Sequence, residues 1–169
     1  MPAPDGSPIY ALCTNLEVVT LPTLCDGVTQ LLPGDHARPL EVWEASTRAT
    51  HTFLTEQDLR SFRGFARYGL TRFRLIYTVR NTKDEVVGFI ALNGEKIEML
   101  FVHPDYRAHG VGKRLVQYAV EVLGATQVDV NEQNDQALGF YLHLGFTVSG
   151  RSEHDGTGRP YPILHMTLA

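Results

Sequence analysis

The sequence contains few of the features that mark secreted, membrane-bound or redox proteins. Its two cysteines, Cys13 and Cys25, are too few for a disulfide framework, and no Cys-x-x-Cys pair is present. No apolar run reaches the roughly 20 residues that a membrane-spanning helix needs. The first residues do not combine a basic segment with an apolar one, as a signal peptide does. We therefore expect a cytoplasmic protein with reduced thiols and no membrane partner.

A long basic run is also absent, and the formal net charge is −4. This charge argues against a nucleic-acid partner but leaves a nucleotide ligand open. The seven histidines include no pair with the spacing of His-Glu-x-x-His, so we expect no metal site. No repeat or low-complexity segment divides the 169 residues, which suit one domain with a sizeable core.

We expect a single domain over residues 28–169, preceded by an extension of unknown role over residues 1–27. Within the extension, residues 16–21 form a short apolar piece that fits an edge strand or a docked tail.

The stretch from Ile97 to Leu115 is the most informative part of the chain. Residues 97–102 are apolar except for Glu98 and include β-branched Ile97 and Val102, which predicts a mostly buried strand that ends before Pro104. From Val111 onward, apolar residues recur at helical spacing. The stretch therefore predicts a strand, a tight turn and a helix.

Three cations, Arg107, Lys113 and Arg114, surround the start of this helix, where the helix dipole disfavours positive charge. An anion bound there would account for them. Gly110 and Gly112 let the backbone approach a ligand closely, and the free N–H groups of a helix N-terminus bind phosphate. Together these residues predict a phosphate or pyrophosphate site.

Two familiar phosphate-binding loops do not fit this spacing. A Walker loop needs a glycine where the chain has Arg107, and a serine or threonine where it has Arg114. A dinucleotide-binding fingerprint that starts at Gly110 needs a further glycine where the chain has Leu115. The pattern that remains is Arg-x-x-Gly-x-Gly.

The other patterns predict an α/β fold with a mixed sheet. Strands over residues 74–79, 86–92 and 97–102 form a meander, with Asn93-Gly94 as a two-residue hairpin turn. A whole helix separates residues 97–102 from a short strand at 127–131, so these two strands can pair in parallel. Further strands are expected at 28–32, 146–148 and 161–168, and helices at 36–49, 55–68, 111–124 and 135–144.

The second expected helix has a capping-box-like start, Thr55-x-x-Asp58. Its apolar face is predicted to include Leu59, Phe62 and Phe65. Its arginines, Arg60, Arg63 and Arg67, are expected to face solvent.

A second motif follows at residues 134–146, where the chain has Asn134-x-x-Ala137-x-x-Phe140-Tyr141-x-x-x-Gly145-Phe146. With Arg107-x-x-Gly110-x-Gly112 before it, the chain resembles the GNAT superfamily of acetyl-CoA-dependent N-acetyltransferases, and within it the bacterial YjaB-like group. The resemblance covers about residues 28–168. It implies the GNAT fold, a mostly antiparallel sheet with a splayed parallel strand pair at its centre and about four flanking helices.

The resemblance implies that acetyl-CoA is the acetyl-donor cosubstrate. Its pantetheine arm is expected to pair with the backbone of residues 100–102 at the splay, and to accept or donate a hydrogen bond at Asn134. Its pyrophosphate is expected on the backbone N–H groups of residues 108–113. The implied cofactor-binding residues are Leu100, Phe101, Val102, Arg107, Ala108, His109, Gly110, Val111, Gly112, Lys113 and Asn134.

The resemblance also implies that the Tyr141 phenol lies near the cofactor sulfur and protonates the leaving thiolate. A tyrosine of ordinary pKa, about 10, is a competent acid for such a thiolate. The backbone N–H of Val102 is our candidate for polarising the thioester carbonyl. Direct attack in a ternary complex needs no enzyme nucleophile, and we find no Ser/His/Asp or Cys/His arrangement in the sequence. The structural alternatives are a core aromatic for Tyr141 and a helix N-cap for Asn134.

His51, Asp129 and Asn131 are candidates for the acceptor side of the site. Asp129 and Asn131 share one strand face, and His51 belongs to a patch similar to the YjaB-like group. That group tends to have asparagine where this chain has Asp129, so its acceptor is not transferred. The alternative for His51 is a packed, hydrogen-bonded histidine. Glu98 is either a general base acting through water or a solvent-facing charge.

The sequence thus predicts an N-acetyltransferase that moves an acetyl group from acetyl-CoA to a small-molecule or peptide amine, as a monomer or homodimer. Two alternatives stay open. One is a non-catalytic acetyl-CoA-binding sensor or docking module, and the other is an enzyme that transfers a longer acyl group.

Overall fold

A computed structural model of the chain describes residues 27–169, so the apolar piece at residues 16–21 lies outside the described residues. Its centre is a seven-stranded sheet of order β1-β2-β3-β4-β5-β7-β6. All neighbouring strands are antiparallel except β4 and β5, which are parallel. The strands are β1 (Val28–Gln30), β2 (Leu75–Arg80), β3 (Val86–Asn93), β4 (Lys96–Val102), β5 (Gln127–Asn131), β6 (Phe146–Ser152) and β7 (Ile163–Leu168).

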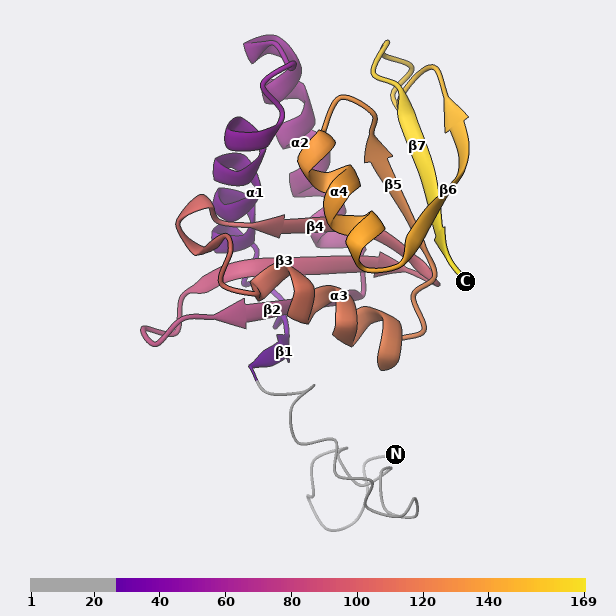
Figure 1. Cartoon of the computed structure of the whole chain (residues 1–169). Helices are drawn as coiled ribbons and strands as arrows, with labels where there is room; N and C mark the ends of the chain where they lie inside the picture. Colours follow the sequence, from indigo (N-terminus) through magenta and orange to yellow (C-terminus); the bar gives the residue numbers. More distant parts are fainter. Residues whose placement is uncertain (1–26) are drawn as a thin grey trace, which may run out of the picture.

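The parallel pair at the centre of the sheet is short. Strands β4 and β5 are paired only at Lys96↔Gln127 and Ile97↔Val128. Beyond these residues β4 continues alongside β3 as far as Val102, while β5 turns away from it. Figure 1 shows the result, in which β1 to β4 run across the view and β5, β7 and β6 stand steeply to them. A wedge therefore opens between β4 and β5, and the expected fold class is confirmed.

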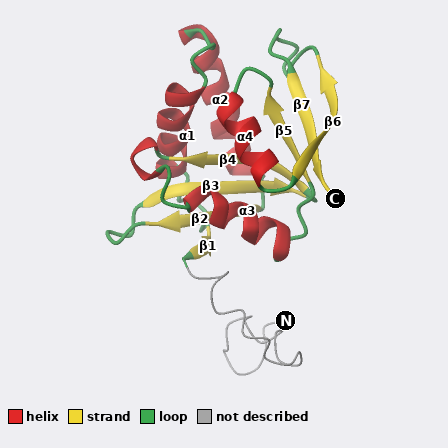
Figure 2. Ribbon diagram, viewed as in Figure 1, coloured by secondary structure: helices red, strands yellow, loops and turns green. Residues whose placement is uncertain are grey.

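Two pairs of helices cover the two faces of the sheet (Figure 2). Helices α1 (Ala37–Thr50) and α2 (Glu56–Arg72) pack on one face, and α3 (Val111–Glu121) and α4 (Asp135–His143) on the other. Along β4, Ile97 is buried in the core beneath α3 and α4, and Met99 in the core beneath α1 and α2. Residues two apart share a face in a regular strand. A β-bulge separates Ile97, opposite Leu92, from Met99, opposite Ala91, and turns the two side chains to opposite faces. A short 3-10 helix, η2 (Pro104–Tyr106), links β4 to the loop before α3.

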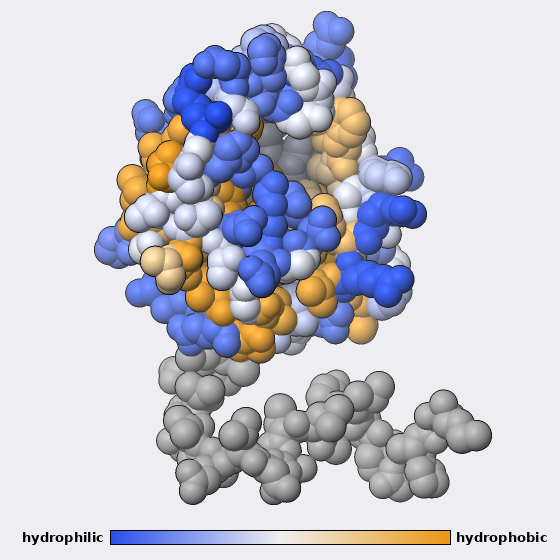
Figure 3. Space-filling view, turned by 90° about the vertical axis from the view of Figure 1, so that its right-hand side faces the viewer, coloured by the Kyte–Doolittle hydropathy of each residue, from blue (hydrophilic) through white to orange (hydrophobic). Residues whose placement is uncertain are grey.

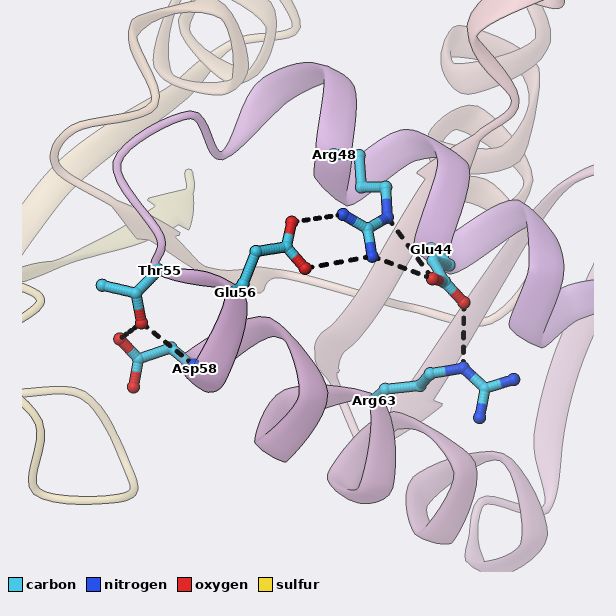
Figure 4. A network of polar contacts seen from close by, with 6 residues as sticks. All are labelled: Glu44, Arg48, Thr55, Glu56, Asp58 and Arg63. Carbon is cyan, nitrogen blue, oxygen red and sulfur yellow. Dashed lines mark hydrogen bonds and ion pairs between the residues drawn. The ribbon is translucent and has the colours of Figure 1, made fainter.

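Ion pairs fix α2 against α1 (Figure 4). Arg48 lies between two carboxylates, 2.6 Å from Glu56 and 3.3 Å from Glu44. Arg63 is exposed, as expected, and its Nε lies 2.9 Å from Glu44 Oε2. The hydrogen bond from Arg63 is the main cause that lowers the pKa of Glu44. Because exposed pairs contribute about 0–1 kcal/mol each, we assign them to helix orientation more than to stability.

Three local expectations need correction. Asn93 pairs with Lys96, so the hairpin turn is Gly94-Glu95, with Gly94 at φ 59°. Helix α2 continues to Arg72, and α3 ends at Glu121, before the expected stop at residue 124. Phe65 is 55% exposed because Leu59, Ala66 and Leu70 form the buried stripe of α2.

The edge of the sheet that β6 forms lies on the side seen in Figure 3. Hydrophilic residues divide the apolar residues of this face into small groups. Among residues 27–169, no helix is both long and apolar enough to cross a membrane.

Gly88 on β3 lies beneath α3, where side chains of the helix pack closely on the strand. A Cβ added there would lie 2.6 Å from Val111 Cγ1 and 3.4 Å from Leu115 Cδ1. We expect Gly88→Ala to lower the free energy of unfolding by about 1–3 kcal/mol through overpacking. Urea unfolding of the wild type and the variant measures this difference in the free energy of unfolding. The control is Gly64→Ala, at an exposed helical position with nothing within 4 Å, which should be neutral or slightly stabilising. Equal stability of the Gly88→Ala variant and the wild type would contradict the packing described.

Candidate active site

Three adjoining cavities surround the wedge between β4 and β5. The helix-terminus cavity, of about 340 Å³, lies where the N-terminus of α3, α4 and the end of β4 meet. The splay cavity, of about 200 Å³, lies between β4 and β5 themselves. The aromatic cavity, of about 690 Å³, lies between α1, α2, β4 and the loop that joins β6 to β7. His51 and Phe101 line all three, so the cavities meet at these two residues.

Most residues expected to bind the cofactor lie together around the helix-terminus cavity. His109 is an exception, because its Nδ1 contacts the Arg107 carbonyl oxygen at 2.6 Å and the residue does not line this cavity. Phe140 of the second motif lines it as well, as do Ser46, Thr50 and Gln136, which were not singled out from the sequence. The expected residues found there are Leu100, Phe101, Val102, Arg107, Ala108, Gly110, Val111, Gly112, Lys113 and Asn134.

The start of α3 has the properties of an anion site. Gly110, at φ 77°, is the N-cap of α3 and offers no side chain to cap the first-turn N–H groups. Ala108 is also left-handed, at φ 61°, so the loop turns tightly before the helix. A Cβ on Gly112 would lie 3.5 Å from Phe140 and 3.7 Å from Val102, which both line the helix-terminus cavity. The free N–H groups and the missing side chains fit a pyrophosphate.

Arg107 connects the loop before α3 to α1. Its Nη2 donates to both the carbonyl oxygen and the hydroxyl of Ser46, each at 3.2 Å. Burial lowers the pKa of Arg107, although a guanidinium stays charged at any physiological pH. Lys113 lines the same cavity and is exposed, whereas Arg114 does not line it.

Two residues of the second motif, Asn134 and Tyr141, also line the helix-terminus cavity. Asn134 Oδ1 accepts a hydrogen bond from the Ala137 N–H at 3.1 Å, which confirms it as the N-cap of α4. Tyr141 is only 5% exposed, and its ring packs edge-on against Phe140 and Phe146. Its hydroxyl has no hydrogen bond to any described residue, and burial of the residue raises the pKa of the phenol. Tyr141 lines both the helix-terminus and the splay cavity.

The acceptor-side candidates lie at the splay. Asp129, Asn131 and His51 all line the splay cavity, together with Glu98. Asp129 accepts from Lys96 Nζ at 2.8 Å, and its Oδ1 contacts His165 Nδ1 at 2.7 Å. Burial alone would raise the pKa of Asp129, but Lys96 and His165 outweigh it and lower the pKa.

The same contacts form an arrangement that the sequence did not suggest. His165 Nε2 lies 2.7 Å from Ser152 Oγ, so Ser152, His165 and Asp129 are linked like a Ser/His/Asp triad. The expectation that no such arrangement exists was wrong, because the three residues come from neighbouring strands. Neither Ser152 nor His165 lines any of the three cavities, and the His165 side chain is 41% exposed. We therefore interpret these bonds as cross-strand pairing between β5, β7 and β6.

The aromatic cavity combines apolar walls with two carboxylates, Glu98 and Asp155. Thr47 Oγ1 also belongs to it and is buried without a hydrogen-bond partner among the described residues. An orphaned hydroxyl of this kind is costly unless a ligand or water satisfies it. The rings that line the cavity are Trp43, Phe62, Phe65, Tyr68, Phe73, Phe101 and Tyr161.

Asp58, in the first turn of α2, connects that helix to the β6–β7 loop. Its Oδ2 accepts from the Tyr161 hydroxyl at 2.6 Å, and its Oδ1 lies 3.0 Å from Arg159 Nε. Arg159 in turn lies 5.0 Å from the centre of the Phe62 ring. Asp58 thereby fixes the loop that supplies Asp155 and Tyr161 to the aromatic cavity. The hydrogen bond from Tyr161 is the main cause that lowers the pKa of Asp58.

We expect Asp58→Asn to raise the KM for the acceptor about three- to tenfold, which corresponds to the loss of one charge-assisted contact. The affinity for acetyl-CoA should not change, because Asp58 does not line the helix-terminus cavity. Steady-state kinetics and calorimetry measure the two effects. Asp84→Asn, an exposed carboxylate in the β2–β3 turn, is the control. An unchanged acceptor KM would show that the loop is held without Asp58.

Comparison with known proteins agrees with this geometry. The family model described as "Acetyltransferase (GNAT) domain" matches residues 73–148. The chain is 42% identical over 125 residues to the peptidyl-lysine N-acetyltransferase YjaB of Escherichia coli (strain K12), covering 74% of this chain and 84% of that protein. The chain therefore belongs to the GNAT family of acetyltransferases and is an acyltransferase that uses acetyl-CoA.

Within this family, solved structures give the same result for the fold. The solution structure of apo-form YjaB from Escherichia coli has a TM-score of 0.77 and 35% identity, and covers 84% of this chain and 96% of that chain. The PaiA N-acetyltransferase from Thermoplasma acidophilum, solved in complex with coenzyme A, has a TM-score of 0.66 and 20% identity. The match covers 84% of this chain and 98% of that chain. The second similarity supports the fold alone.

Proposed function

We propose that this protein transfers an acetyl group from acetyl-CoA to a lysine side-chain amine of a peptide or protein. The observation that carries this proposal is the position of Tyr141. The residue is buried at the wall shared by the helix-terminus and splay cavities, and its hydroxyl has no hydrogen bond to a described residue. On one side of it lies the uncapped terminus of α3, and on the other lies the aromatic cavity with its carboxylates.

Acetyl-CoA supplies an activated thioester, and this chain's residues hold and polarise it. The N–H groups from Ala108 to Lys113 bind the pyrophosphate, and Arg107 and Lys113 contribute positive charge. His103 N–H donates to Val87 of β3, so the N–H of Val102, one residue earlier, points to the other edge of β4, into the wedge. That N–H is placed to hydrogen-bond the thioester carbonyl oxygen.

The acceptor amine attacks the carbonyl carbon directly, and a C–N bond replaces the C–S bond. Tyr141 donates its proton to the departing sulfur. Burial raises the pKa of the phenol and makes it a weaker acid. The same burial raises the pKa of the thiol that forms when the thiolate takes up the proton, so the difference between the two pKa values changes little. No acyl-enzyme forms in this mechanism.

The aromatic cavity fits a lysine side chain, whose alkyl stem packs on rings while its cationic head is attracted to Glu98 and Asp155. The relatives named peptidyl-lysine N-acetyltransferases support this acceptor class.

The test is thiol release from acetyl-CoA with three acceptors: a peptide with one internal lysine and a blocked N-terminus, the same peptide with a free N-terminus and no lysine, and a small diamine. We expect the lysine peptide to accelerate thiol release most. Acceleration by the diamine alone would overturn the acceptor class. No acceleration, with acetyl-CoA still bound, would favour a binding module.

A further inference from the structure

His51 occupies the point at which the three cavities meet. It is the C-cap residue that follows α1, and its half-buried imidazole lines the helix-terminus, splay and aromatic cavities. In the proposed reaction the thioester comes from the first cavity and the amine from the third. A group at their junction can contact the reacting nitrogen.

The hydrogen bonds around His51 determine which ring nitrogen carries the proton. The Thr50 hydroxyl donates its only hydrogen to the Ser46 carbonyl oxygen, at 2.9 Å. Thr50 Oγ1 also contacts His51 Nδ1 at 2.9 Å, so in this second bond it must be the acceptor. His51 Nδ1 therefore carries the hydrogen. Nε2 is left with a lone pair, and it has no hydrogen bond to any described residue.

The other bases near the splay already have partners. Asp129 is bound by Lys96 and His165, which stabilise its charged form and weaken it as a base. Asp155 Oδ1 accepts three hydrogen bonds from Thr157 and Arg159 within its own loop. Glu98 lies 3.8 Å from Lys96 Nζ. The Nε2 lone pair of His51 has no such partner among the described residues.

We propose that His51 Nε2 accepts the proton that the acceptor amine loses as its nitrogen bonds to the acetyl carbon. This inference rests on the proposed function. The C–N bond forms as the C–S bond breaks, one proton moves from nitrogen to His51, and one moves from Tyr141 to sulfur. The imidazolium then releases its proton to solvent and the phenolate takes one up, so each turnover restores both side chains.

Acetyl-CoA and His51 should be coupled through Arg107. Burial, and after it the charge of Arg107, lowers the pKa of His51 to about 4, against a smaller opposing effect of the Thr47 carbonyl. An anion bound beside Arg107 cancels part of that repulsion and raises the pKa of His51 toward the working pH, where a general base is most effective. The other titratable side chains that share a cavity with His51 are Tyr68, Glu98, Tyr106, Lys113, Asp129, Tyr141, Asp155 and Tyr161.

The first test is independent of activity. Nitrogen NMR of the free protein should show His51 as the Nδ1–H tautomer, with a pKa well below the ordinary value of about 6.5. Acetyl-CoA should move that pKa upward. An Nε2–H tautomer, or a pKa that does not respond to acetyl-CoA, would overturn the inference.

The second test uses two histidines. His51→Asn keeps a donor for Thr50 but has no base, and we expect kcat to fall about 10²-fold with little change in acceptor KM or acetyl-CoA affinity. Added imidazole should restore part of the rate. His165→Asn, which keeps a donor for Asp129, is the matched control and should retain the wild-type kcat. A loss of kcat in His165→Asn with wild-type kcat in His51→Asn would overturn the inference, because the proton of the amine would then pass to the linked residues Ser152, His165 and Asp129. If wild-type protein acetylates no lysine peptide, the proposed function fails, and the NMR result alone decides on His51.

Discussion

Replacing Tyr141 with phenylalanine is expected to lower kcat by about 10²- to 10⁴-fold while leaving the affinity for acetyl-CoA within about twofold of the wild type. The substitution removes only the hydroxyl, which has no hydrogen bond among the described residues, and keeps the ring contacts with Phe140 and Phe146. Folding should therefore be unaffected. Stopped-flow thiol release and calorimetric titration measure the two quantities.

Tyr118→Phe on α3 is the control, because Tyr118 lies outside the three cavities. A Tyr141→Phe variant with wild-type kcat would show that the residue is only a core aromatic.

The pH dependence of the rate gives a second check on Tyr141. Because burial raises the pKa of Tyr141, the phenol stays protonated at a pH where an ordinary tyrosine, of pKa about 10, ionises. The rate should therefore not fall as the pH rises toward about 10.

Gly112→Val is expected to weaken acetyl-CoA binding by about 30-fold, or about 2 kcal/mol. A Cβ at this position clears the protein's own atoms, since its nearest neighbours, on Phe140 and Val102, lie at 3.5 Å and 3.7 Å. It would instead occupy the helix-terminus cavity, where the pyrophosphate must approach the first-turn N–H groups of α3. Calorimetry with acetyl-CoA measures the loss, and circular dichroism checks the fold.

The matched control is Gly139→Val on α4, where an added Cβ meets nothing within 4 Å. It carries the same cost of a β-branched residue in a helix but leaves the cavity open. Equal acetyl-CoA affinity of Gly112→Val and Gly139→Val would contradict the placement of the cofactor at the start of α3.

The parts of the fold that depend on local chemistry could be predicted from the sequence. The glycines at residues 110 and 112 predicted the tight turn at the start of α3, and Asn134 predicted the start of α4. The strand pattern at 97–102 gave β4, and the helix that separates it from β5 gave the parallel pairing. The turn, the helix start and the strand are each determined within about ten residues, where periodicity, capping and turn preferences act. The parallel pairing follows from the length of the connection between the two strands.

Contacts between distant segments could not be predicted. Asp58 and Tyr161 are 103 positions apart, Arg107 and Ser46 are 61 apart, and nothing in their local sequence indicates a partner. The link between Ser152, His165 and Asp129 depends on the register of three strands, which only the folded sheet fixes. The exposure of Phe65 was missed because α2 rotates to bury Ala66 and Leu70.

One local pattern in the sequence could have predicted a hydrogen bond of His51 but was not recognised. Thr50 lies four residues after Ser46, the spacing at which a helical threonine hydroxyl donates to the carbonyl one turn earlier. His51 follows directly, at the end of the helix. The pair therefore indicates in sequence the bond that determines the tautomer of His51.

The most direct test of the account is mass spectrometry of a lysine peptide after incubation with the full-length protein and isotope-labelled acetyl-CoA. The account predicts one labelled acetyl group per peptide, located on the lysine Nε, that forms with wild-type protein and at least about a hundredfold more slowly with Tyr141→Phe. Label on the peptide at equal rates with and without the Tyr141 hydroxyl would contradict the mechanism. No label from a protein that binds acetyl-CoA would contradict the acceptor.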